Sequence, residues 1–279
     1  DVLDLITHLV DKSLTVMQEY STGARYDLLE SIRQYALEKL VASGEAESVR
    51  ANHFAYFSQL AASAEPKLRT DEQMDCLARL EIEHDNLRVA LKWTMGRHAV
   101  EAGLCLAGAL ARFWYLRGYW NEGRGWLRLL LEQPAPGDPP PADYLSARMR
   151  ALAGAGWLAD EDGSDLPLYR ECLTLARRLG DRWCEAFALR GLSAVTTSWA
   201  DLEAAEPQLN ESLALFTALG DHWGMGLVRF NRGWLALEQD DTLAAETEWQ
   251  SGLEHFQHCG DRWGIAVTVG ALGYVARLR

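Results

Sequence analysis

Most of the chain carries apolar residues at the spacing of helices that pack on a core. Leucines mark two such segments at equivalent points, namely Leu173, Leu175 and Leu179 in the first and Leu213, Leu215 and Leu219 in the second. A further stretch of the same kind covers residues 223–237. An apolar stripe along one face lets a helix pack on its neighbours. The central and C-terminal parts are therefore predicted to be packed helices.

The first 64 residues follow another pattern. Residues 14–20 have the composition of a strand, and residues 25–28 can return as a second strand after a turn. Ser31 and Gln34 have the spacing of a capping box, which predicts a helix from there to Gly44. Another helix is expected over 47–64. A short hairpin between helices is the outline of a winged helix, so a partial winged-helix module is expected over 1–64.

A four-residue block of Gly, Asp, Arg or His, and Trp occurs three times at intervals of 40 residues, at 180–183, 220–223 and 260–263. Glycine suits the left-handed position that follows a helix. Aspartate suits the N-cap of the next helix, where its carboxylate accepts a backbone N–H. A strict period of this length is typical of stacked helical hairpins. The tryptophan that ends each block is expected to pack between successive units.

Small residues keep the same interval of 40, as at Ser193, Gly233 and Gly273. Small side chains let two helix axes approach closely, and here the chain resembles a tetratricopeptide (TPR) repeat. The usual TPR period is about 34 residues, so longer helices or turns are expected. An earlier, irregular unit repeats residues 233–236 at 156–159, with a deletion near 160–165. The expected fold is mainly α, a TPR-like helical-hairpin superhelix preceded by a partial winged-helix module.

The domain organisation follows from these patterns. After the module over 1–64, residues 65–132 are expected to form a helical connector and the first TPR-like hairpins. Residues 133–142 are a proline-rich linker that holds five of the eight prolines. A surface loop, a hinge and a proline-rich ligand all remain possible for it. Residues 143–279 are expected to be TPR-like repeats of period 40, truncated at the C-terminus.

Three segments resemble bacterial signal-transducing NTPase regulators of the AfsR and large LuxR type. They are residues 9–14 (LVDKSL), 25–36 (RYDLLESIRQYA) and 80–91 (LEIEHDNLRVAL). In that family a nucleotide-binding domain precedes the winged helix, and TPR-like repeats follow it as a sensor. The resemblance implies a sensor or protein-interaction region that binds a partner or effector and controls an attached NTPase module.

The chain itself has no GxxxxGK[ST] phosphate-binding loop. No cofactor is therefore expected in it, and ATP or GTP is expected only in a missing N-terminal domain. Because the chain begins at Asp1 and ends soon after Trp263, we expect a fragment of a larger protein. Its final helix is expected to expose an unpaired apolar face that includes Val267, Leu272 and Val275.

Composition narrows the possible functions. The net charge of −13 opposes nucleic-acid binding, which needs a basic face. Residues 1–64 alone hold nine acidic and five basic side chains. No apolar run approaches the ~18 residues needed to span a bilayer. Five scattered cysteines favour reduced thiols and a cytoplasmic location. We expect no direct nucleic-acid contact and no membrane association.

The concave face of the array is the expected binding surface, because arginine and aromatic side chains are favoured at interfaces. The residues assigned to it are Arg190, Arg229, Phe230, Asn231, Arg232, Trp234, Tyr274 and Arg277. Its partner is expected to be a protein or peptide, or a small effector, and self-association is possible. In the alternative interpretation Arg229 and Arg232 pair with neighbouring acids and Trp234 belongs to the core.

Two other kinds of site are weighed against that surface. A small-molecule sensor would need an enclosed pocket, whose aromatic residues would be Trp114, Trp120, Trp126 and Trp157. An enzyme or metal site is not expected. The nearest candidates are His255, His258 and Cys259 in the last turn of a helix, and the acid–base cluster Glu81, Glu83, His84 and Asp85. Both clusters are better explained as helix-end and helix-surface residues.

Overall fold

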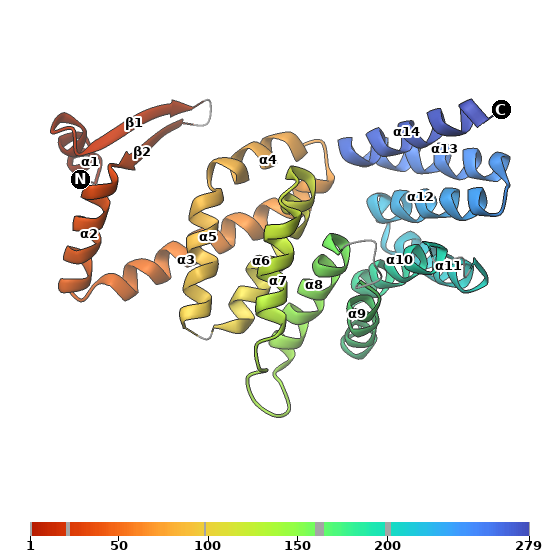
Figure 1. The fold of residues 1–279 in the computed structure, drawn as a ribbon, viewed down its shortest axis with the longest axis horizontal. Coiled ribbons are helices and arrows are strands. Elements are labelled where there is room, and N and C mark those ends of the chain that lie inside the picture. Colours follow the sequence, from red (N-terminus) through yellow and green to blue (C-terminus); the bar gives the residue numbers. More distant parts are fainter. Residues whose placement is uncertain (1, 21–22, 98, 160–164, 199–201, 279) are drawn as a thin grey trace. The chain divides into compact units, whose positions relative to one another are not determined.

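A computed structural model describes residues 2–20, 23–97, 99–159, 165–198 and 202–278 of the chain (Figure 1). The chain forms two compact units, Asp1–Tyr56 and Phe57–Arg279. Almost all of the regular structure is helical, and the strands described are the two of one hairpin. The predicted mainly α fold is therefore confirmed.

The first unit contains a β-hairpin set between helices. Its elements are α1 (Val2–Asp11), β1 (Thr15–Tyr20), β2 (Gly23–Leu28), α2 (Glu30–Ala42) and the start of α3 (Ala46–Ala64). The strands are antiparallel, with Thr15 opposite Leu28 and Met17 opposite Tyr26. The hairpin predicted between helices is thus present. No residue of α1 or α2, both described in full, is buried.

The capping box predicted for Ser31 and Gln34 is wrong. Helix α2 begins one residue earlier, at Glu30, and its N-cap Leu29 makes no side-chain capping hydrogen bond. Ser31 therefore lies inside the first turn, where its hydroxyl cannot cap the helix. The Gln34 Nε2 atom instead donates to Glu30 Oε1 at 3.0 Å, and Arg33 pairs with the same carboxylate. An acid at the first helical position also complements the helix dipole.

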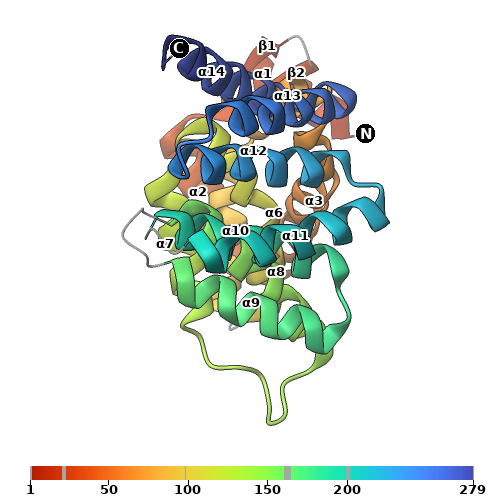
Figure 2. The same cartoon turned by 90° about the vertical axis from the view of Figure 1, so that its right-hand side faces the viewer.

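The second unit is an array of helices. After the end of α3 come the 3₁₀ helix η1 (Pro66–Arg69), α4 (Gln73–Ile82), α5 (His84–Gly96), α6 (Val100–Arg117), α7 (Trp120–Leu131), α8 (Ala142–Leu158) and α9 (Asp165–Leu179). They are followed by α10 (Arg182–Ser198), α11 (Leu202–Leu219), α12 (His222–Glu238), α13 (Thr242–Cys259) and α14 (Arg262–Leu278). Figure 2 shows α9 to α14 stacked in chain order. Helix α10 packs on α8 and α12, and α12 packs on α14, so these alternate helices form one row of the array.

The Gly-Asp corners have the predicted geometry. Gly180, Gly220 and Gly260 all have positive φ, at 72°, 66° and 80°. Asp181 Oδ1 accepts the backbone N–H of the third residue after it, and Asp221 Oδ1 does the same, each at 2.9 Å. Equivalent bends therefore recur at the predicted interval of 40 residues. The third aspartate has different partners, which are described with the site.

One prediction about the array is wrong, and another concerns residues outside the described part of the chain. Val275, predicted to be exposed, is buried in a cluster with Trp249 of α13, and Leu272 packs against that cluster. The inner face of α14 thus finds its partner in the preceding helix rather than in a following one. The deletion expected near 160–165 falls mainly on residues 160–164, which lie outside the described part of the chain.

The proline-rich segment joins two helices of the same unit. It follows α7, and α8 packs against both α6 and α7. Residues 133–141 therefore form a surface loop within the second unit, as the first of the three interpretations has it. Among the described residues, no helix combines the length and the apolar content that crossing a membrane requires.

Candidate functional site

The repeated tryptophans connect successive corners of the array. The Trp183 indole N–H donates to Asp221 Oδ2 at 2.6 Å, and the Trp223 indole N–H donates to Asp261 Oδ2 at 2.8 Å. Each indole thus binds the N-cap aspartate that lies 38 residues further on. The two rings are also nearly parallel, with centroids 6.2 Å apart and an interplanar angle of 9°. The prediction that these tryptophans pack between units is confirmed for both.

Asp261 joins the array to the front of the same unit. Its side chain is fully buried and accepts three hydrogen bonds. Gln73 Nε2 donates to Oδ1 at 2.6 Å, and Arg112 Nη2 donates to Oδ2 at 2.8 Å, where Trp223 also donates. Both Gln73 and Arg112 donate in addition to the Leu68 carbonyl, at 2.8 and 3.0 Å. The third corner is therefore held by η1, α4 and α6, and we call these contacts the Asp261 hub.

Close packing around the hub supports the same connection. A Cβ atom at Gly260 would lie 2.7 Å from the backbone nitrogen of Asp71, so only glycine allows this approach. Tyr115 of α6 meets Trp263 of α14 edge to face, with ring centroids 5.5 Å apart. The second unit is therefore closed on itself between residues that lie far apart in the sequence.

Four aromatic side chains line the space that this closure surrounds. Trp157 of α8, Trp183 and Phe187 of α10, and Trp223 of α12 form what we call the aromatic wall. Phe187 stacks on Trp157 and on Trp183, with ring centroids 5.4 and 5.1 Å apart. Trp223 stacks on Trp157 at 5.7 Å. Stacked rings bury a large apolar area in a fixed geometry, so the wall is a rigid surface.

Three guanidinium groups lie on the aromatic wall. The distances from guanidinium carbon to the nearest ring centroid are 4.5 Å for Arg69, 4.7 Å for Arg112 and 4.8 Å for Arg190. These are cation–π distances. Arg69 also pairs with Glu65, and Arg112 pairs with Asp261. Burial lowers the pKa of Arg69 to about 10 and also lowers the pKa of Arg112, which Asp261 opposes. Both groups stay positively charged at neutral pH.

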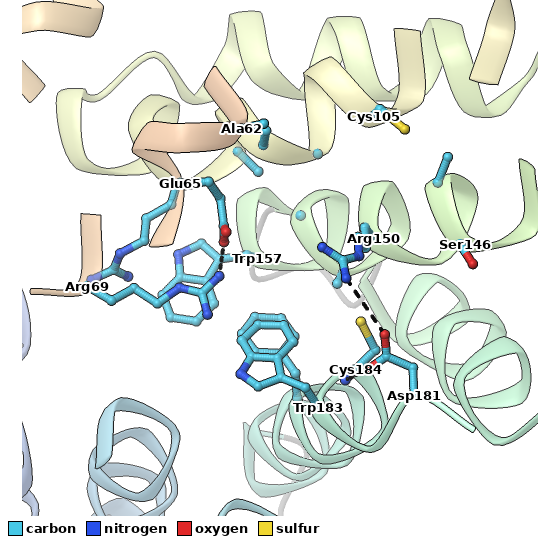
Figure 3. A pocket seen from close by; sticks show the side chains of 18 of the residues that line it. Ala62, Glu65, Arg69, Cys105, Ser146, Arg150, Trp157, Asp181, Trp183 and Cys184 are labelled. Atoms are coloured by element: carbon cyan, nitrogen blue, oxygen red, sulfur yellow. Dashed lines mark hydrogen bonds and ion pairs between the residues drawn. The ribbon is translucent and has the colours of Figure 1, made fainter. Parts of the chain in front are cut away.

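The cavity beside the wall has a volume of about 670 Å³ and two different ends. Figure 3 shows Glu65, Arg69 and Trp157 on one side of it and Cys105, Ser146 and Arg150 on the other. We call the first side the aromatic end. The second side is the acidic end, which holds Cys105, Ser146, Arg150 and Asp181. The lining residues Glu101 and Asp143 belong to it because they act electrostatically on Cys105. Small residues of α6 and α8, such as Gly108 and Ala147, leave room between the ends.

The residues assigned to the concave face lie outside the cavity. Arg190 is buried behind the aromatic wall, and its carbonyl accepts from Asn231 Nδ2 at 3.3 Å. Arg229 and Arg232 both pair with Glu248 of α13, as the alternative interpretation has it. None of the eight assigned residues lines the cavity. A role for them in partner binding stays a prediction.

The aromatic residues on α12 and α14 form a separate surface pair. Trp234 packs edge to face on Trp249 at 5.3 Å and lies 6.4 Å from Tyr274. Trp234 keeps 38% of its surface exposed, and Tyr274 keeps 41%. Phe230 is half-buried, and Arg277 is exposed. These side chains could contact a partner without any change in the core.

The alternative prediction was an aromatic pocket, but most of the tryptophans predicted for it do not line the cavity. Only Trp157 of the four predicted tryptophans lines the cavity. Trp114 is fully buried in the core, and Trp120 is half exposed to solvent. Trp183 and Trp223 line the cavity in their place. The repeat pattern had singled out both of these residues, although only as packing residues.

The structure places a third histidine, His222, beside His255 and His258. His222 of α12 places its Nδ1 atom 3.0 Å from Nδ1 of His255 and stacks on His258 at 3.8 Å. Burial lowers the pKa of His255. Within the described ranges, no set of side chains has the arrangement of a metal site. The three histidines lie where α12 packs on α13.

The second acid–base cluster takes part in contacts between α5 and α7. His84 is buried, its ring lies 4.4 Å from that of Tyr119, and its Nε2 atom is 3.5 Å from Glu122 Oε1. Burial lowers the pKa of His84, and hydrogen bonds from Arg88 lower the pKa of Glu122. These contacts fix α5 against α7 and lie outside the cavity.

The lowered pKa values predict that the free energy of unfolding decreases as the pH is lowered. Each group binds its proton more weakly in the folded chain, so its contribution is complete above its unfolded pKa and is lost as pH falls. For His84 the loss starts near 6.5, and for Glu122 it starts near 4.5. Urea denaturation from pH 7.5 to 4 should show a declining free energy of unfolding. His84→Phe should reduce the loss that starts near 6.5, while the part that belongs to His255 remains, and an unchanged profile would contradict this.

Comparison with known proteins relates most of the chain to one group. No protein-family model matches it. The protein of Mycobacterium tuberculosis (strain ATCC 25618 / H37Rv) named "Putative HTH-type transcriptional regulator Rv0890c" is 38% identical over 218 residues. A Mycobacterium bovis protein with the corresponding description matches equally well. Each match covers 75% of this chain, but the chain spans only 24% of the relative's length.

The chain was also compared with solved structures, and one of the matches has low similarity. The crystal structure of BtubC (BKLC) from P. vanneervenii is 18% identical, with a TM-score of 0.45. The superposition covers 82% of this chain and 83% of that one. The sequence matches are closer than this structural match. They show that the chain is similar to one part of longer proteins described as HTH-type transcriptional regulators.

Proposed function

We propose that this chain is the signal-sensing region of a bacterial transcriptional regulator and that the cavity of the second unit receives the signal. The cavity itself is the observation that carries the proposal. Its volume of about 670 Å³ lies in the range of small-molecule sites, which run from about 300 to 1,000 Å³. Like such sites, it combines an aromatic surface with a few polar groups. The similarity to regulator proteins supplies the biological setting.

The closure of the unit suggests how a signal is passed on. The aromatic end is built from η1, α6, α8, α10 and α12, and the Asp261 hub connects three of these elements, η1, α6 and α12. A molecule that touches the front helices and the array at once stabilises the closed arrangement. It acts as a switch only if its affinity differs between closed and open forms. Control of an attached NTPase module in the cytoplasm, with no catalytic role for the chain, is part of the proposal.

A protein partner is the second candidate, and the exposed pair Trp234 and Tyr274 favours it. Aromatic side chains that are half exposed and held by packing are common anchors at protein interfaces. Such a partner would bind on α12 and α14, away from the residues that line the cavity. The two candidates can therefore be separated by substitution.

The test uses the full-length regulator and transcription from its own promoter. Cys105 is exposed at the acidic end of the cavity, so Cys105→Trp fills the cavity without disturbing the core. We expect this variant to reduce the response to the inducing condition at least about tenfold, which is about 1.4 kcal/mol of lost coupling. Gln250→Trp adds the same bulk at an exposed position of α13 and should respond normally.

The outcomes separate the candidates. A normal response of Cys105→Trp, with protein present at the normal level, would reject the cavity as the signal site. If Trp234→Ala alone abolished the response, the partner surface would be the better explanation. Loss in both cavity and control variants would show that added bulk on any helix disturbs the regulator, and it would also count against the proposal.

A further inference from the structure

We infer that the cavity binds an organic carboxylate, with its one carboxylate at the aromatic end and an aromatic or otherwise flat apolar body beside the aromatic wall. The inference rests on the proposed function, because it names the ligand class of that same cavity. It starts from hydrogen-bond donors that the fold buries and leaves without an acceptor.

Three residues that line the cavity each carry such a donor. Arg69 Nε, Arg112 Nη1 and Trp157 Nε1 are buried and have no hydrogen-bond partner within the described part of the chain. Only 7% of the Arg112 side chain is exposed. Folded proteins pair nearly all buried polar groups, because an unpaired one is costly. Three unpaired donors from α8, α6 and η1 around one cavity therefore indicate a bound acceptor.

A fourth donor lies just behind the wall. Arg190 Nε is also buried without an acceptor, and its guanidinium covers the rings of Trp157 and Phe187. Its positive charge adds to the field at Trp157 without contact with the cavity. The donors thus belong mainly to guanidinium groups, which form their strongest hydrogen bonds with carboxylate oxygens. A carboxylate offers two oxygens with about four acceptor positions, enough for the three donors of the lining residues.

The acidic side chains around the cavity limit the ligand to one carboxylate group. Glu65, Asp221 and Asp261 already lie beside the guanidinium groups of the aromatic end. The opposite end carries Glu101, Asp143 and Asp181 against the single cation Arg150. A second negative group on the ligand would meet these carboxylates at close range and be repelled. A molecule with one carboxylate and an uncharged remainder fits both ends.

The body of the ligand is inferred from the wall. Trp157, Trp183, Phe187 and Trp223 all line the cavity, and their ring planes are nearly aligned. A flat apolar group can lie against such rings and gains from both burial and stacking. Small residues such as Ala147 and Gly154 also line the cavity, and their short side chains leave space in it.

The experiment compares three naphthalene probes by titration calorimetry with the full chain. 2-Naphthoate has the proposed carboxylate, 2-naphthylmethanol replaces it with a neutral group, and naphthalene-2,6-dicarboxylate adds a second carboxylate at the far end. We expect 2-naphthoate to bind at least tenfold more tightly than either of the others. Equal affinity of the carboxylate and the alcohol, or no binding of 2-naphthoate, would overturn the inference.

Two variants test the named donors. Trp157→Phe removes the indole N–H but keeps an aromatic ring, and Arg69→Met removes the guanidinium. Each should reduce the affinity for 2-naphthoate about tenfold and leave the affinity for the alcohol nearly unchanged. Trp234→Phe and Arg232→Met, which change the same residue types outside the cavity, are the matched controls and should bind as the unaltered chain does. A carboxylate preference that survives both cavity variants would also overturn the inference.

The result is separable from the test of the proposed function. If 2-naphthoate and the alcohol bind equally and Cys105→Trp prevents the binding of both, the cavity is a ligand site but its inferred preference for a carboxylate is wrong. If 2-naphthoate binds with the expected preference while the Cys105→Trp regulator responds normally, the chemistry holds and the signalling role is rejected.

Discussion

Replacing Asp261 with alanine is expected to lower the free energy of unfolding by about 3–5 kcal/mol, the cost of leaving a buried charge without its partner. The carboxylate is fully buried and accepts from Gln73, Arg112 and Trp223. Its removal leaves the Arg112 guanidinium buried without its counter-ion and leaves two further donors unpaired. Urea denaturation followed by circular dichroism measures the loss.

Asp241→Ala is the matched control for this substitution. Asp241 caps α13 by accepting the backbone N–H of Ala244 at 2.9 Å, but it is exposed and has no hub contacts. Loss of an N-cap costs about 1 kcal/mol. Equal losses for the two variants would mean that Asp261 acts only as a helix cap and that the hub does not stabilise the closed unit.

Gly233→Ala is expected to lower the free energy of unfolding by about 1–3 kcal/mol, the usual cost of overpacking a core. A Cβ atom at this position would overlap the indole of Trp249. That ring is fully buried, and its N–H donates to the Phe230 carbonyl at 3.0 Å, so it cannot move aside without losing the hydrogen bond. Helix α12 would have to move away from α13 instead.

The control is Gly273→Ala, 40 residues further along the chain. A Cβ atom at Gly273 would meet nothing within 4 Å. Alanine is the better helix former, so the variant should be unchanged or more stable by up to about 1 kcal/mol. Urea denaturation of both variants shows whether the cost of alanine depends on local packing or on the repeat position. Similar effects at both positions would contradict the packing argument.

The repeated corners were predictable because their chemistry is local. A glycine that must adopt positive φ and an aspartate that caps the next helix depend only on neighbouring backbone, so Gly220 and Asp221 could be assigned from the sequence. The tryptophan of each block has no such local task. Since the blocks recur at equal intervals, its packing between units could be expected, as Trp183 and Trp223 confirm.

The hub and the cavity were not predictable in the same way. Gln73 and Arg112 belong to helices outside the period, and they lie 188 and 149 residues from Asp261. No spacing rule connects positions so far apart. The predicted concave surface was placed by counting along α10, α12 and α14, whereas the cavity forms where the corners meet the front helices. Of the residues that line the cavity, only Trp157 had been assigned to a pocket from the sequence.

Two local predictions failed for reasons that the contacts explain. A glutamate one position before Ser31 begins α2 and takes the side chains of Arg33 and Gln34, which removes the capping box. Val275 was expected to need a following helix, but the preceding helix α13 supplies Trp249 as its partner. In both cases a residue close by makes the contact that the prediction had given to another partner.

A crystal structure of the chain grown with 2-naphthoate tests the central claim most directly. The claim is that closure around the Asp261 hub creates a site for one carboxylate at the aromatic wall. The carboxylate should lie within hydrogen-bond distance of Arg112 Nη1 and Trp157 Nε1, with the rings beside the wall. A cavity that holds only ordered water under these conditions, or one filled by the wall's own side chains, would contradict the account.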